Sequence, residues 1–325
     1  MDVRLITPDG VARHRPDEIE TLLDGPGLTW IDVRYWDAET AAFLGERLGL
    51  HRGVLHDCAH RNSVPKVRAY SDETFVVLHA PEPGRGGHVH YVELDQHIGP
   101  NWLLTVHGPM NPAVPLDAAY VETGAVARRL DRGSLRPTRS ADLSAALVDV
   151  LTGRLREYLV GRTREVWRLE QQVTGGYLGD PERFLEELFA VRHGLLAVHT
   201  MAVSNREVYG RMAQLVVFGA DGTARLHDLE DQFDRVAAMA DSQRAYLQGV
   251  IEFYETRTHT TMALAAERLA VIAAVTLPIT ALSGVLGMNV LVSAATLWGP
   301  LVVILAAMLV MSTVMLVWTR RKGWW

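Results

Sequence analysis

A glycine, a methionine and an asparagine at the end of an apolar segment are the residues of this chain best suited to metal chemistry. Gly287, Met288 and Asn289 close a run from Leu269 that contains no Asp, Glu, Lys or Arg. The backbone carbonyl of Gly287 and the side-chain carbonyl of Asn289 would be neutral oxygens at a helix C-terminus, which carries partial negative charge. Mg²⁺ prefers oxygen ligands and loses its water reluctantly, so such oxygens suit recognition of a hydrated ion. The alternative is that these residues only end the helix, because Gly and Asn both tolerate left-handed C-cap geometry.

Two histidine pairs also have spacings that suit a metal. His56 and His60 would share a helix face, as a zinc pair does, and His88 and His90 would share one face of a strand. No third or fourth ligand follows at the usual spacing, so we interpret both pairs as surface histidines. Cys58 is the only cysteine, which excludes an intrachain disulfide. Because the sequence has no phosphate loop, Gly-x-Ser-x-Gly nucleophile or Cys-x-x-Cys pair, we expect no enzyme activity.

Two apolar segments must position these oxygens. No charged residue occurs from Leu269 to Met288 or from Leu297 to Trp318. Each segment has about twenty residues, enough for a helix to cross the roughly 30 Å hydrocarbon core. In lipid a backbone must satisfy its own hydrogen bonds, so we expect two membrane helices joined by a short connection. The sequence therefore predicts a membrane protein.

Charge sets the expected orientation. Arg268 precedes the first segment, and Arg320, Arg321 and Lys322 follow the second, which places both flanks in the cytoplasm by the positive-inside bias. The N-terminal residues lack a secretory signal. We expect a multi-pass protein of the cytoplasmic membrane with both termini cytoplasmic. The net charge of −6 argues against nucleic-acid binding.

The remainder of the chain divides into an α/β part and a helical part. Short β-rich runs at Thr74–Ala80, His88–Ile98 and Trp102–His107 predict an α/β cytoplasmic domain over residues 1–140. Residues 141–267 have the three-and-four spacing of helices and form a cytoplasmic helical region with a stalk helix. Residues 268–325 complete the chain as a two-helix transmembrane domain with a basic tail.

Local signals mark the ends of the expected helices. The first should end at the Gly-Gly pair 175–176, and the second should begin at Pro181 after Asp180 as N-cap. The Gly-Ala-Asp-Gly segment 219–222 predicts a turn.

A heptad seam follows that expected turn. Apolar residues alternate three and four apart from Leu226 to Tyr254, with one polar interruption at Gln243. No break follows before the membrane, so we expect one helix from about Leu226 to Asn289, on the order of 100 Å long. A helix of that length needs lateral partners, which its own chain and symmetry-related copies could supply.

The Gly287-Met288-Asn289 block, after an apolar helix containing Pro278 and before a second span, resembles the signature of the CorA-type two-transmembrane divalent-cation channels. Further segments look like that family's cytoplasmic domain and tail, in the same order: Trp30–Val33, Val64–Val67, Phe75–Ala80, Trp102–His107 and Arg320–Trp325. The resemblance implies an α+β membrane protein in which an N-terminal α/β domain is followed by a stalk helix that continues into the first of two transmembrane helices. It also implies a homo-oligomeric, pentameric funnel.

The resemblance also implies a function and residue roles. The protein would transport a divalent cation, Mg²⁺ first and Co²⁺ second, with no cofactor, and residues 287–289 would form the selectivity filter. Thr280 and Leu269 match a pore-lining threonine and an apolar constriction. Intracellular Mg²⁺ would bind acids between subunits and close the pore, and gap-free counting places Glu252 and Asp228 at such positions. The alternatives are a threonine bonded to its own backbone, a lipid-facing leucine and two solvated carboxylates.

Some features leave other functions open. Leu286 stands where the family often has Tyr, and residues 290–296 contain no acid, whereas many CorA-type loops carry a Glu. A ZntB-like Zn²⁺ transporter is the main alternative, and sequence does not decide the ion, the direction of transport or proton coupling. Mg²⁺ is preferred because Met288 and Asn289 keep the form of the Mg²⁺ channels. A membrane-tethered cytosolic sensor or scaffold is the other alternative, for which Asn289→Ala would be harmless.

Overall fold

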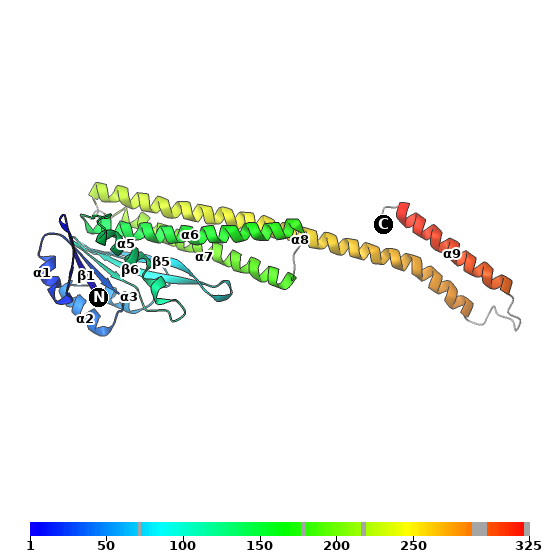
Figure 1. The fold of residues 1–325 in the computed structure, drawn as a ribbon, viewed down its shortest axis with the longest axis horizontal. Helices are drawn as coiled ribbons and strands as arrows, with labels where there is room; N and C mark the ends of the chain where they lie inside the picture. The colour runs from blue at the N-terminus through cyan, green and yellow to red at the C-terminus, as the bar shows by residue number, and fades with distance from the viewer. Residues whose placement is uncertain (71–72, 177–179, 216–218, 288–297, 322–325) are drawn as a thin grey trace. The chain divides into compact units, whose positions relative to one another are not determined.

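The computed structural model describes residues 1–70, 73–176, 180–215, 219–287 and 298–321 (Figure 1). The chain divides into two compact units, Met1–Val250 and Ile251–Trp325. The strands are β1 (Asp2–Thr7), β2 (Gly10–His14), β3 (Leu28–Val33), β4 (Lys66–Ala69), β5 (Thr74–Pro83), β6 (Val89–Ile98) and β7 (Trp102–Val106). The helices are α1 (Ile19–Leu23), α2 (Ala38–Arg47), α3 (Arg52–Ala59), α4 (Leu116–Ala119), α5 (Val121–Asp131), α6 (Ser140–Gly175), α7 (Pro181–Met212), α8 (Gly219–Gly287) and α9 (Trp298–Arg321), with 3-10 turns η1 (Pro16–Glu18) and η2 (Arg85–Gly87). The domain boundaries at residues 140 and 267 remain predictions.

A seven-stranded sheet forms the centre of the first unit. Its strand order is β2-β1-β3-β7-β6-β5-β4, and β3 and β7 are the parallel pair among otherwise antiparallel neighbours. The three predicted β-rich runs are confirmed as β5, β6 and β7. An α/β arrangement therefore precedes the long helices, as the sequence predicts.

Helices cover both faces of the sheet. Ile19 of α1, Leu44 of α2 and Val54 of α3 pack with Ile31 and Leu104 of the sheet in one buried apolar cluster. The opposite face lies against α5, α6 and α7, as the hydrogen bond from Ser144 of α6 to Gln96 of β6 illustrates (Figure 1). Successive strand residues point to opposite faces, so a strand covered on both sides is apolar almost throughout.

The long helices begin and end close to the predicted positions. Gly176 follows α6 with φ of 79°, a left-handed cap that favours glycine. Asp180 accepts a hydrogen bond from the backbone N–H of Glu182 at 3.0 Å, and Pro181 is the first residue of α7. α8 contains 69 residues, so the continuous helix is confirmed as far as Gly287.

The turn predicted at residues 219–222 is wrong, because α8 begins at Gly219. The first N–H groups of a helix have no partner within the helix, so glycine and aspartate cost less in the first turn than in the middle. The same residue types therefore suit a turn and a helix start equally well.

The heptad seam of α8 packs against α6 and α7 of its own chain. The Phe233 ring lies 5.7 Å from that of Tyr209, and Gln232 hydrogen-bonds to Thr152 and Asp149 at 3.1 Å. Seam residues from Leu226 to Val250 are mostly buried in the single chain. The expectation that helices of the same chain supply partners for α8 is therefore confirmed, and contact between copies of the chain stays a prediction.

The second unit contains the end of α8 and all of α9. Two helices are long and apolar enough to cross a membrane, within Gly222–Gly284 and Val302–Arg321. Their apolar side chains are largely uncovered, including Leu277 and Leu309. Such faces suit contact with lipid or with other helices rather than with water. The two predicted spans correspond to the end of α8 and to α9.

Candidate functional site

The residue that ends α8 is Gly287, the first of the three candidate filter residues. Met288 and Asn289 lie outside the described residues. The last backbone carbonyls of a helix have no donors within the helix, so such carbonyls can accept hydrogen bonds from water or from a hydrated ion. Gly287 would therefore contribute a backbone carbonyl to the candidate filter.

One face of α8 leads to Gly287. Leu269, Thr276, Thr280 and Gly287 are spaced by seven, four and seven residues, which places them within about 20° of a common line at 100° per residue. The side chains of Leu269, Thr276 and Thr280 are exposed. Sequence reasoning selected Leu269 and Thr280 but missed Thr276, although the seven-residue spacing from Leu269 was a usable signal.

The hydroxyl protons of the two threonines on this face are used in hydrogen bonds, but the hydroxyl oxygens can still accept one. Thr280 Oγ1 donates to the carbonyl of Thr276 at 2.9 Å, and Thr276 Oγ1 donates to that of Ile272 at 2.9 Å. The backbone bonding considered as an alternative for Thr280 is therefore present. It does not remove the hydroxyl as a ligand, because each oxygen keeps lone pairs that can accept a hydrogen bond from a water of hydration.

The two candidate regulatory acids are far apart on one helix. Asp228 and Glu252 are both exposed on α8 and are separated by 24 residues, about 36 Å at 1.5 Å per residue. They cannot share one ion within a chain. Among the described residues no group of three or more His, Cys, Asp or Glu side chains is placed to hold a metal ion.

The histidine pairs lie at the surface of the first unit. His60 follows α3 in an extended conformation, so the two residues do not share a helix face as expected. The His56 and His60 rings lie 4.1 Å apart, and His60 Nδ1 is 2.8 Å from the carbonyl oxygen of His56. His88 precedes β6, and its ring is 4.7 Å from that of His90. Cys58 is buried, which raises the pKa of its thiol.

A buried acid pair on β6 was missed by the sequence reasoning. Asp95 is 1% exposed, and neither of its carboxylate oxygens has a hydrogen-bond donor among the described residues. Glu93 accepts two hydrogen bonds from Asn62, at 2.6 and 2.9 Å. Burial raises the pKa of both carboxyls, and the neighbouring Glu93 raises that of Asp95 further. The pair is therefore suited to sharing a proton.

A second buried network joins β3, β7 and α5. Asp32 Oδ1 accepts from Thr105 Oγ1 at 2.6 Å and lies 3.0 Å from His107 Nε2. Burial opposes ionisation of Asp32, but hydrogen bonding to His107 and Thr105 holds its pKa below the usual value. Thr123 Oγ1 approaches the same His107 nitrogen at 3.4 Å. A nucleophile relay needs the acid and the hydroxyl on different ring nitrogens, so this geometry does not form one.

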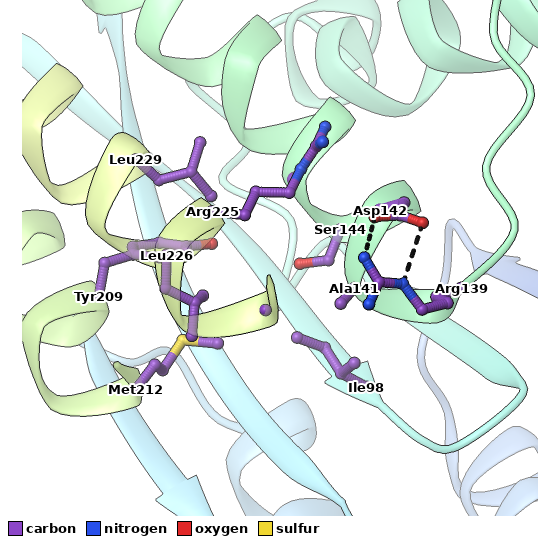
Figure 2. A pocket seen from close by; sticks show the side chains of 12 residues that line it. Ile98, Arg139, Ala141, Asp142, Ser144, Tyr209, Met212, Arg225, Leu226 and Leu229 are labelled. Atoms are coloured by element: carbon purple, nitrogen blue, oxygen red, sulfur yellow. Dashed lines mark hydrogen bonds and ion pairs between the residues drawn. The ribbon is translucent and has the colours of Figure 1, made fainter. Parts of the chain in front are cut away.

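A small cavity lies beside the start of α8 (Figure 2). Ile98, Ser144, Tyr209 and Leu229 are among its lining residues, and its volume is about 10 Å³. At its edge Arg139 bonds to Asp142, which lowers the pKa of Asp142. The cavity has room for about one water molecule and is too small for a metabolite.

Comparison with known proteins relates the whole chain to membrane transporters. A family model described as CorA-like Mg²⁺ transporter protein matches residues 25–321. The cobalt/magnesium transport protein CorA of Thermotoga maritima is 23% identical over 319 residues, which cover 94% of this chain and 87% of that protein.

Two solved structures show the shared fold. The complete CorA magnesium transporter from Methanocaldococcus jannaschii has a TM-score of 0.80 at 18% identity, covering 100% of this chain and 99% of that one. The ZntB cytoplasmic domain from Vibrio parahaemolyticus has a TM-score of 0.61 at 9% identity, covering 80% of this chain and 98% of that domain.

Proposed function

This chain belongs to the CorA-like Mg²⁺ transporter family, and we propose that it conducts divalent cations, Mg²⁺ first and Co²⁺ second, across the cytoplasmic membrane. The name of the Thermotoga maritima relative, a cobalt/magnesium transport protein, supports this choice of ions. The observation that carries the proposal is the path of α8. One helix leaves the first unit, enters an apolar segment and ends at Gly287 with two hydroxyls on the same face.

The proposed pore is formed by several copies of this face. One helix cannot enclose a channel, so we propose a homo-oligomer, a pentamer, around a symmetry axis. Residues 287–289 would form a ring of neutral oxygens that binds hydrated Mg²⁺ without removing its water. Thr276 and Thr280 would accept hydrogen bonds from that water, and Leu269 would form an apolar constriction that closes by dewetting.

The remaining assignments follow from this arrangement. Residues 1–140 and 141–267 would form the cytoplasmic domain and stalk, and residues 268–325 the membrane domain. The basic residues that flank the spans support cytoplasmic termini. The cation is cargo and regulator rather than a catalytic group, and we propose neither an enzyme activity nor a cofactor.

Flux measurements on the purified protein test this function. The protein would be reconstituted in liposomes that contain dyes sensitive to Mg²⁺, Co²⁺ or Zn²⁺. We expect Mg²⁺ entry, weaker Co²⁺ entry and no signal in protein-free liposomes. Absence of entry for all three ions into liposomes that contain correctly assembled protein would contradict the proposal.

A Zn²⁺ transporter is the second candidate. The likeness of 80% of this chain to a ZntB cytoplasmic domain favours it, although a complete CorA transporter matches the full chain with a higher TM-score. The same assay separates the two, because Zn²⁺ entry without Mg²⁺ entry would identify the alternative. A tether or scaffold is tested by Asn289→Ala, which would then leave every function of the protein intact.

A further inference from the structure

A cavity of about 320 Å³ lies between α5 and one end of the sheet in the first unit. Its lining includes Arg4 of β1, Arg13 of β2, Trp30 and Asp32 of β3, and Arg34 just beyond β3. This volume is within the usual range for small-molecule sites, which begins near 300 Å³. The cavity is separate from α8 and takes no part in the proposed ion path.

The strand register explains why so many polar side chains meet here. Arg4 is the direct partner of Arg13 on one side and of Trp30 on the other, and Asp2 is the partner of Asp32. Directly paired residues of antiparallel strands point to the same face of a sheet. The alternate residues, such as Val3 and Ile31, point into the apolar cluster under α1 and α2. This end of the sheet therefore has one polar face, which α5 covers.

The floor of the cavity is rigid and buried. Arg4 is 3% exposed, and its guanidinium bonds to Asp2 at 3.0 Å and to Asp131 of α5. The Trp30 indole N–H donates to Thr105 at 3.1 Å, and Thr105 donates to Oδ1 of Asp32. Such bonds fix the side chains before any ligand arrives, which lowers the entropy cost of binding.

The mouth of the cavity carries positive charge that is only weakly paired with carboxylates. Arg13 is 66% exposed and lies 3.6 Å from Asp131, which also pairs with Arg4. Arg34 is exposed, and its guanidinium rests over the Tyr120 ring at 5.0 Å. Guanidinium groups present several donors in a fixed fork that matches phosphate oxygens.

Small side chains of α5 keep the space open. Gly124 and Ala127 line the cavity on the helix side, together with Thr123. A Cβ added at Gly124 would meet only Nη1 of Arg128, at 3.4 Å, within 4 Å. Larger residues at these positions would fill the space between α5 and the strands.

From this geometry we propose that the cavity binds a small phosphomonoester that also carries hydroxyl groups. Arg13 and Arg34 hold the phosphate at the mouth, and the ionised Asp32 on the floor accepts a hydrogen bond from a ligand hydroxyl. The charges favour this class over a simple anion, because the lining contains both exposed guanidinium groups and carboxylates. The site would let a soluble metabolite bind to the first unit of a transporter.

Calorimetry on the full chain in detergent tests the site with three probes: ribose 5-phosphate, AMP and inorganic phosphate. We expect saturable binding of ribose 5-phosphate, AMP or both, and weaker binding of inorganic phosphate, which has no hydroxyl for Asp32. Binding of ribose 5-phosphate alone would indicate a sugar phosphate, and tighter binding of AMP would indicate a nucleotide.

Three variants make the test specific. Arg34→Gln should weaken binding about tenfold to a hundredfold, as expected for the loss of a charge-assisted hydrogen bond. Ala127→Leu should weaken it by filling the cavity without changing charge. Arg15→Gln removes an exposed arginine next to β2 that does not line the cavity and should bind as wild type does. No saturable binding by wild type, tighter binding of inorganic phosphate than of either ester, or equal binding by wild type and Arg34→Gln would overturn the proposal.

Discussion

At the scale of single residues, the proposed conduction chemistry depends on neutral oxygens rather than on charge. Thr276 and Thr280 each direct their hydroxyl proton to the preceding turn, which leaves their oxygens as acceptors. A ring of acceptors can hold the waters around a divalent ion without stripping them. This makes the end of α8 chemically different from a site that coordinates a bare ion with carboxylates.

The filter prediction concerns Gly287 and Asn289. Asn289→Ala should lower Mg²⁺ flux by at least about two orders of magnitude, because each lost hydrogen bond contributes on the order of 1 kcal/mol and the ring repeats it in every copy. Gly287→Ala should also impair flux by altering the helix end. Dye-loaded liposomes provide the measurement, and Thr313→Ala on α9 is the matched membrane control. Wild-type flux in a correctly assembled Asn289→Ala protein would refute the filter assignment.

A buried histidine makes the first unit sensitive to acid. Burial lowers the pKa of His79 to about 4, although a hydrogen bond to the carbonyl of Asn62 opposes the shift. The unfolded value is near 6.5, so the neutral form stabilises the fold fully above pH 6.5. We expect the free energy of unfolding to fall by about 3 kcal/mol as the pH drops from 6.5 to 4.

Urea unfolding followed by near-ultraviolet circular dichroism at several pH values would measure the slope of the free energy of unfolding against pH. His79→Gln keeps a hydrogen-bond donor but cannot titrate, so it should flatten the slope in this pH range. His259→Gln, at an exposed position on α8, should not. An unchanged slope in His79→Gln would assign the acid sensitivity to other groups.

At the scale of elements, we propose different roles for two segments of α8. Its heptad seam binds α6 and α7 through residues such as Phe233, while the face from Leu269 to Gly287 remains uncovered. The helix is thus anchored along its first part, and its later part has exposed side chains that other copies can contact. This division would allow one helix to be part of a packed unit and, as proposed, to form the wall of a pore.

The face of α8 that contains Thr276 and Thr280 gives a prediction about Mg²⁺ flux. Replacing both Thr276 and Thr280 with valine removes two acceptor oxygens per copy and keeps the side-chain shape. We expect Mg²⁺ flux to fall about tenfold, because a hydrated ion then meets an apolar wall. Thr313→Val on α9 is the control, since it removes a similar hydroxyl bonded to its own backbone. Equal flux in the double variant and wild type would place the pore on another face of α8.

Regulation gives a second prediction for α8. If Asp228 and Glu252 lie at subunit boundaries, internal Mg²⁺ should bridge like charges and favour a closed bundle. Asp228→Asn combined with Glu252→Gln should raise the half-inhibitory Mg²⁺ concentration at least about fivefold while conduction persists. Flux at several internal Mg²⁺ concentrations measures this, with Asp241→Asn, another exposed acid of α8, as control. The same half-inhibitory concentration in wild type and the double variant would locate regulation elsewhere.

At the scale of the whole molecule, the single chain leaves apolar surface in both units uncovered. Met239 and Phe253 of α8 and Trp167 of α6 are each about half exposed in the first unit or next to its boundary. Isolated exposed apolar residues are ordinary, but several large ones on long helices fit contact between copies. The buried heptad seam cannot serve this purpose.

Native mass spectrometry in detergent tests the assembly. We expect one dominant homo-oligomer with the mass of five chains, because a pore needs several copies of the α8 face. Replacing Met239 and Phe253 together with glutamate should shift the population toward smaller species, whereas glutamate at exposed Ala238 should not. A stable monomer that still conducts ions would contradict the proposed assembly.

The sequence by itself determined the features that depend on local order along the chain. The apolar runs, the cap at Asp180, the glycine end of α6 and the continuity of α8 follow from nearest neighbours and helical period, so they could be predicted. The face shared by Leu269, Thr276 and Thr280 was equally encoded, although Thr276 was missed. The family resemblance, which also rests on local sequence, selected residues 287–289 as the proposed filter.

Only the tertiary structure decided which surfaces meet. The heptad seam has the same spacing whether its partner is another copy or α6 and α7, and only packing shows that it is filled within one chain. Glu93 and Asp95 of β6 are two residues apart, as the exposed acids of a solvent-facing strand would be. Asp95 is nevertheless buried, because a helix covers that part of the sheet. The arginines around the 320 Å³ cavity are unremarkable in sequence and converge only through strand pairing. Periodicity specifies a face of an element, whereas the partner of that face is set by contacts between residues distant in the chain.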